Sequence, residues 1–154
     1  MRKIDIKSLP VRRGSGYPSP HNEPVAARER RPLCRTAGLT EFGVNLLTLK
    51  PGVWSSQRHW HSHADEFVFG VSGEVVLVTD AGEEVLRAGE CAAFKAGDPD
   101  GHHLINRSDA DAVVLEIGNN DPARDRTVYS DIDMVLEPGE GPPRHKDGTP
   151  YPAP

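Results

Sequence analysis

The feature that most constrains this chain is a series of short apolar segments, each ended after a few residues by glycine, proline or aspartate. Within each segment apolar and polar residues alternate, as they do over residues 42–49. This two-residue period is typical of a strand with one buried face, and no segment has the period of an amphipathic helix. The pattern predicts an all-β sandwich or barrel, with strands at residues 42–49, 57–61, 66–71, 74–79, 84–87, 91–94, 103–106 and 112–117.

The two ends of the chain differ from this central region in composition. Five prolines between residues 10 and 32 exclude a regular helix from most of the first 35 residues. The last 18 residues are again rich in proline and glycine. We therefore predict an extended N-terminal arm (1–35), a β-barrel (36–136) and an extended tail (137–154). The arm either lies loosely on its own barrel or crosses to a second subunit, and residues 131–136 are a candidate for one more strand.

Length and charge limit the classes of function. The 154 residues are enough for one domain, and a net charge of −5 disfavours binding to a phosphate backbone. A short basic cluster, Arg28, Arg30 and Arg31, is interrupted by Glu29, so we expect it to be solvated. No apolar stretch is long enough for a signal sequence or a membrane span. We predict neither a nucleic-acid partner nor a membrane partner.

The two cysteines indicate the redox setting. Cys34 and Cys91 have neither the spacing of a metal-binding pair nor that of a disulfide framework. A reducing compartment fits this usage, so we expect the protein to be cytoplasmic. Cys91 is expected to be a small buried residue.

Histidines form the most informative pattern. Five of the seven fall in two groups, at positions 59, 61 and 63 and at positions 102 and 103. Because alternate residues of a strand share a face, His59 and His61 should present their imidazoles side by side. Glu66 follows a short bend and opens the next strand, where it can return to the same point. Imidazole and carboxylate together suit Fe, Mn, Ni or Zn.

The spacing of these residues matches two known motifs. Gly52…His59-x-His61-x4-Glu66-x6-Gly73 resembles the first cupin motif, and Gly89-x5-Lys95-x-Gly97…His102-x3-Asn106 resembles the second. The resemblance, which covers residues 40–118, is to small single-domain bacterial cupins with a type-2 conserved barrel. It implies a double-stranded β-helix barrel with one divalent metal ion in its wider mouth. It assigns the ligand roles to His59, His61, Glu66 and His102, which leaves an octahedral ion two open positions.

Several neighbouring residues carry separate expectations. His63 has the parity of His59 and His61, so it is an alternative ligand, a group behind the ligands or a solvent-facing residue. Lys95 stands where the family usually has proline, and Pro99 supplies a similar turn. Gly70 interrupts a strand and is expected to widen the cavity. His103 should point away from His102 to the barrel surface, and Asn106 should anchor a turn.

These observations lead to two hypotheses about function. The first is a metal-dependent enzyme, an oxygenase, isomerase or lyase, that acts on a small organic molecule in the barrel. The alternative is a non-catalytic cupin that binds or senses a sugar or a carboxylate. No general base is identifiable, so the sequence leaves the reaction open. Exposed sheet edges and the proline-rich arm predict a homodimer.

Overall fold

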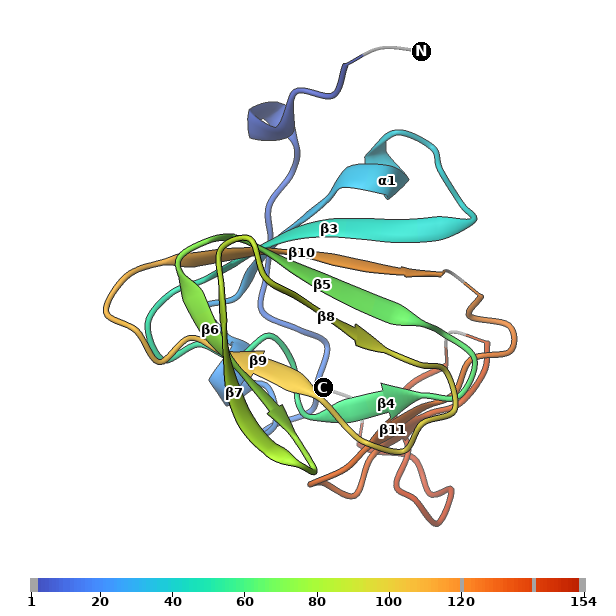
Figure 1. Cartoon of the computed structure of the whole chain (residues 1–154). Coiled ribbons are helices and arrows are strands. Elements are labelled where there is room, and N and C mark those ends of the chain that lie inside the picture. Colours follow the sequence, from blue (N-terminus) through green and yellow to red (C-terminus); the bar gives the residue numbers. More distant parts are fainter. Residues whose placement is uncertain (1–2, 120, 140, 153–154) are drawn as a thin grey trace.

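The structure, a computed structural model, describes residues 3–119, 121–139 and 141–152 (Figure 1). The outermost residues of the two predicted arms, 1–2 and 153–154, lie outside this part. The described chain is mostly strand, with one four-residue helix, α1 (Leu33–Thr36), and two single-turn 3-10 helices, η1 (Ile6–Ser8) and η2 (Glu23–Val25). The predicted all-β class is confirmed.

All eight predicted strands are present, with ends displaced by at most two residues. The strands in chain order are β1 (Arg12–Arg13), β2 (Glu29–Pro32), β3 (Phe42–Leu49), β4 (His59–His61), β5 (Glu66–Ser72), β6 (Glu74–Thr79), β7 (Gly82–Arg87), β8 (Cys91–Phe94), β9 (His103–Ile105), β10 (Ala112–Asn119), β11 (Thr127–Tyr129) and β12 (Val135–Leu136).

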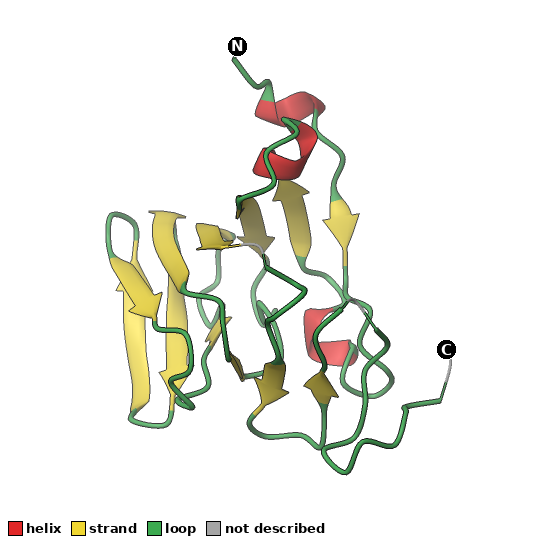
Figure 2. Cartoon of the chain, turned by 90° about the vertical axis from the view of Figure 1, so that its right-hand side faces the viewer, coloured by secondary structure: helices red, strands yellow, loops and turns green. Residues whose placement is uncertain are grey.

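Two walls of strands face each other. One wall is a six-stranded sheet in the order β1-β2-β3-β10-β5-β8. The other is made of two three-stranded sheets, β7-β6-β9 and β12-β11-β4, joined by a backbone bridge between His59 and His102. In Figure 1 the larger sheet lies above the two smaller ones, and Figure 2 shows the same layers turned by 90°.

The space between the walls is apolar in one half and polar in the other. Alternate residues of β3 face inward, and along the strand they change from Gly43 and Asn45 to Leu47 and Leu49, which are fully buried. The apolar half is the core, formed by Leu47, Leu49, Val53, Val68, Val75, Leu77, Leu86, Leu104, Ala112 and Val114. The polar half holds the candidate site.

The first 35 residues contribute strands to the larger sheet. In β2, Arg30 pairs with Leu47 of β3, and Val25 before it is fully buried. The expectation that the basic cluster is solvated is wrong for Arg28, which is only 7% exposed. Its guanidinium turns inward and donates hydrogen bonds to the carbonyl oxygens of Ser55 and Gly14.

The C-terminal part adds a strand that the sequence did not predict. β11 pairs with β4, with Val128 opposite Trp60, so it extends the wall that carries the histidines. The candidate strand at residues 131–136 is reduced to β12, which pairs with the other edge of β11. No helix in the described part of the chain has the length and hydropathy needed to span a membrane.

Four single-residue expectations can be compared with the structure. Gly70 does not widen the cavity: a Cβ there would lie 2.9 Å from the carbonyl carbon of Arg87, so the glycine makes room for another strand's backbone. Cys91 is exposed, because it faces outward from the edge strand β8. His103 is buried and its Nδ1 bonds the carbonyl oxygen of Ser56 at 3.0 Å. Asn106 anchors a turn as predicted, with Nδ2 donating to the carbonyl oxygens of Leu49 and Ala110.

Candidate metal centre

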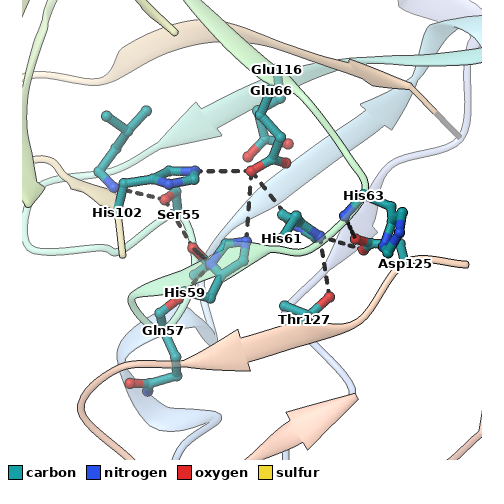
Figure 3. A network of polar contacts seen from close by, with 12 residues as sticks. Ser55, Gln57, His59, His61, His63, Glu66, His102, Glu116, Asp125 and Thr127 are labelled. Carbon is teal, nitrogen blue, oxygen red and sulfur yellow. Dashed lines mark hydrogen bonds and ion pairs between the residues drawn. The ribbon is translucent and has the colours of Figure 1, made fainter. Parts of the chain in front are cut away.

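Two strands, β4 and β5, and the residue just before β9 bring the predicted ligands together (Figure 3). His59 and His61 alternate with Trp60 on β4, so their rings share the inner face, with centroids 5.0 Å apart. Glu66 is the first residue of β5. His102 precedes β9, and two backbone hydrogen bonds with His59 fix it beside β4.

The four side chains meet around one carboxylate oxygen. The Nε2 atoms of His102, His61 and His59 lie 2.9, 3.5 and 3.8 Å from Oε2 of Glu66. Candidate ligand atoms of His59, His61 and Glu66 all lie within 4.8 Å of one another. The site is half-buried, so an ion bound there would be reachable from the polar half of the barrel.

The hydrogen bonds of the rings indicate which nitrogen is free. Nδ1 of His59 donates to the carbonyl oxygen of Gln57 at 2.9 Å, since a carbonyl only accepts. Nδ1 of His61 faces Oδ2 of Asp125 at 2.5 Å. In the neutral rings the proton is therefore on Nδ1, and the Nε2 lone pairs point toward Glu66.

The pKa values of His59 and Glu66 indicate the charges at the site. Burial lowers the pKa of His59 to about 4, so its ring is neutral at pH 7. Burial alone would raise the pKa of Glu66, but the hydrogen bond from His102 and the nearby His59 and His61 lower it to about 2. The Nε2 lone pair of the neutral His59 ring thus faces an ionised carboxylate, an arrangement that a cation satisfies. The donor set of this site fits a divalent metal ion.

His102 differs from the other two histidines. Its Nδ1 is buried without a hydrogen-bond partner among the described residues. The ring is instead held by Phe94, which stacks on it with centroids 3.5 Å apart and an interplanar angle of 1°. Its Nε2 either donates to Glu66 or coordinates an ion.

The structure also distinguishes His61 from the alternative ligand, His63. His63 is exposed, and its Nδ1 bonds Oγ of Ser62 at 2.9 Å. Its backbone N–H donates to Asp125. Figure 3 shows His63 beside Asp125 and away from Glu66, whereas His61 points toward the carboxylate.

A cavity of about 410 Å³ opens beside the cluster, and sequence reasoning missed most of its polar lining. Besides His59, His61 and Glu66, the wall includes Tyr17, Arg28, Arg30, Asn45, Glu116 and Tyr129. One signal was available: Arg28 and Arg30 are two residues apart, so in an extended segment they share a face. Asp125 offered no such signal, because its contact with His61 joins residues 64 positions apart.

Comparisons with known proteins agree with this architecture. The model of the cupin domain family matches residues 45–118. No curated protein matches the chain. A sugar phosphate isomerase of the cupin superfamily from Silicibacter pomeroyi is 43% identical, with a TM-score of 0.92 over 99% of this chain and 98% of that one.

Two more distant structures share the fold. A candidate sugar phosphate isomerase from Acidithiobacillus ferrooxidans is 23% identical over 84% of this chain and 83% of that chain, with a TM-score of 0.73. The polyketide cyclase RemF from Streptomyces resistomycificus is 17% identical over 77% and 79%, with a TM-score of 0.62. At these identities the similarity concerns the fold alone.

Proposed function

This chain belongs to the cupin superfamily, and from that premise we propose that it is a divalent-metal-dependent isomerase of a small phosphorylated sugar. Since the cupin fold hosts many activities, the proposal depends on the site. The observation that carries it is one polar cavity that holds the His59, His61 and Glu66 cluster together with a further carboxylate and two arginines. The 43% identity to a sugar phosphate isomerase over nearly both full lengths supports the same reading.

The cavity has the size and the groups that this reaction needs. About 410 Å³ lies within the usual range for a small-molecule pocket. A divalent ion held by His59, His61, Glu66 and His102 would polarise the carbonyl and hydroxyl oxygens of the sugar. Polar side chains dominate the remaining wall, as a sugar requires. These properties favour the isomerase over the oxygenase among the predicted enzyme classes.

Interconversion of an aldose and a ketose moves a proton between neighbouring carbons, and we assign this role to Glu116. Its carboxylate lines the cavity and is oriented by Arg30, whose Nη2 lies 2.9 Å from Oε2. In the aldose-to-ketose direction the C2–H bond breaks, the carboxylate takes the proton, and the electron pair forms an enediolate. The carboxylate returns the proton to C1 while the hydroxyl proton of O2 moves to O1.

The first test concerns the metal. Protein loaded with Fe(II), Mn(II), Ni(II) or Zn(II) and then desalted should retain about one ion per chain by mass spectrometry. His59→Ala should lose most of this ion. His63→Ala is the matched control, since His63 lies outside the cluster, and it should retain the ion. Equal metal content in the two variants would contradict the proposed centre.

The second test concerns the reaction. The metal-loaded protein is incubated with aldose phosphates in D₂O, and proton NMR follows loss of the aldose signal and exchange at C2. We expect interconversion with at least one substrate, abolished in Glu116→Gln with metal content unchanged. Exchange that persists undiminished in Glu116→Gln would remove Glu116 from the mechanism. No interconversion with any aldose phosphate would overturn the isomerase proposal.

A further inference from the structure

The two arginines of the cavity differ in how their charges are balanced. Arg30 pairs with Glu116, and its side chain is 31% exposed. Arg28 is 7% exposed, and its guanidinium contacts backbone carbonyl oxygens and no carboxylate among the described residues. Its Nη atoms donate to two carbonyl oxygens, and its Nε, like that of Arg30, is buried without a hydrogen-bond partner. A buried cation whose only partners are neutral carbonyls is costly to keep.

Both arginines belong to the same enclosure as the metal cluster. Tyr129 lies between the metal cluster and the arginines. The centroid of its ring is 5.6 Å from that of His59 and 5.4 Å from that of Tyr17, and Tyr17 lines the cavity with Arg28. Burial and the neighbouring Arg30 lower the pKa of Arg28. Glu66 is close enough to Arg30 to contribute to raising the pKa of Arg30, although Glu116 contributes most. All four charged groups, Arg28, Arg30, Glu66 and Glu116, line this one cavity.

A count of charges indicates what kind of ligand this enclosure takes. Among the side chains that line the cavity, Arg28 and Arg30 are balanced by Glu66 and Glu116 when no ion is bound, and Asp125, which faces His61, lies outside this lining. A divalent ion at the histidine cluster leaves two positive charges in excess. A phosphate monoester carries about −1.5 to −2 at pH 7, which is the charge that restores balance. A neutral sugar would leave the excess uncompensated, and a monocarboxylate would remove only half of it.

We propose that Arg28 and Arg30 form the phosphate subsite of this cavity, where they hold the phosphate group of the sugar while its carbonyl end faces the histidine cluster. This assignment rests on the proposed function and places the two ends of its substrate. Guanidinium groups match phosphate oxygens in pairs, which fixes the orientation of the ester as well as its affinity. Tyr17 and Asn45 complete the polar wall around them.

The test compares matched ligands on the metal-loaded protein. Calorimetry measures the affinity for ribose 5-phosphate and arabinose 5-phosphate against ribose and arabinose, with inorganic phosphate as a competitor. We expect at least tenfold tighter binding of the phosphorylated member of a pair. Equal affinity for both members of each pair, or no binding of either member, would overturn the subsite.

Two variants assign the effect to the arginines. Arg30→Gln should weaken binding of the phosphorylated sugar at least about tenfold, the loss expected for one charged hydrogen-bonded contact. The double variant Arg30→Gln/Glu116→Gln keeps the net charge of the wall and should show the same loss. Arg126→Gln is the control and should bind as the wild type does, since the Arg126 side chain is 41% exposed and pairs with Glu137. Wild-type affinity in both Arg30 variants would contradict the proposal.

Arg28 needs a milder change because it also holds backbone carbonyls. Arg28→Lys keeps the positive charge but removes the paired N–H donors of the guanidinium group. Circular dichroism checks that the variant is folded, and affinity is then measured on the folded protein. We expect a loss specific to the phosphorylated sugar. If phosphate-dependent binding is found without interconversion, the isomerase proposal fails and the subsite stands. Interconversion that is equally efficient with unphosphorylated sugars would leave the isomerase and remove the subsite.

Discussion

At the scale of single residues, Asp125 is expected to affect metal binding through its contact with the His61 ring. Asp125 is 12% exposed and faces Nδ1 of His61 at 2.5 Å, which directs the other ring nitrogen to Glu66. Such a partner behind a metal-binding histidine typically accounts for a 10–100-fold effect on affinity. We predict that Asp125→Asn weakens metal binding by about that factor, measured by competition with a chelator.

The control for Asp125 is another carboxylate far from the ring. Asp109→Asn changes an exposed residue in the turn before β10 and should leave the metal affinity unchanged. Circular dichroism must show that both variants are folded. An Asp125→Asn variant with wild-type affinity would mean that Thr127, 3.3 Å from the same nitrogen, is sufficient to orient the ring.

Gly70 is a second residue whose role the structure makes testable. It accepts a hydrogen bond from the N–H of Gly89 and donates one to Glu90, so the turn between β7 and β8 lies directly on it. A methyl group here would overlap the Arg87 carbonyl. We predict that Gly70→Ala lowers the free energy of unfolding by at least about 2 kcal/mol, measured by urea denaturation. Gly141→Ala, where a Cβ would meet no atom within 4 Å, should be neutral.

The ligand residues could be predicted from the sequence, whereas the burial of Arg28 and His103 could not. The ligand candidates were predictable because their spacing follows a strand and matches two motifs. Burial of Arg28 and His103 was not, because each is turned inward by a carbonyl oxygen far away in the chain, that of Ser55 and of Ser56 respectively. Composition assigns such polar residues to the surface, and only the folded backbone supplies the acceptors that keep them inside.

At the scale of elements, the strands of the central alternating region were predicted, whereas β1, β2 and β11, which lie in the two ends of the chain, were not. β3 and β10 have eight residues each and a clear period. β11 has three residues, Thr127–Tyr129, and follows the charged stretch Arg124–Arg126, so no period can be recognised. Its formation depends on the free edge of β4. The missed strand matters to the site, because its register places Thr127 opposite His61.

The N-terminal strand β2 is expected to contribute to the stability of the barrel. It pairs with β3 at Leu46 and Leu47, and the segment before it supplies Val25, which is fully buried. A variant that begins at Leu33 should therefore lose at least about 10 °C in Tm or fail to fold, because it uncovers the core and removes the wall of the cavity.

A shorter truncation is the control, since it also removes N-terminal residues but leaves β2 in place. A variant that begins at Leu9 removes η1, which has no buried residue, and should melt within about 2 °C of the full chain. Thermal denaturation followed by circular dichroism compares the three proteins. If the variant that begins at Leu33 melts like the full chain, β2 is not an integral part of the barrel.

At the scale of the whole molecule, β5 is apolar on both faces. Val68 points into the core, whereas Phe67, Phe69 and Val71 point outward and are 36%, 37% and 45% exposed. The neighbouring β8 ends the sheet, so one of its edges pairs with no other described strand. An apolar stripe beside an open edge is typical of a surface that another chain covers. We propose that a second copy covers it, since a twofold axis brings identical patches together.

Light scattering tests this assembly. The wild-type protein should have twice the chain mass of 16.8 kDa, and Phe69→Glu should shift it to the monomer, because a carboxylate in an apolar contact loses its hydration. Val85→Glu changes a residue that is 43% exposed on the opposite wall and should remain dimeric. A monomeric wild type would refute the dimer. A dimer broken only by Val85→Glu would place the contact on β7 and leave the stripe on β5 unexplained.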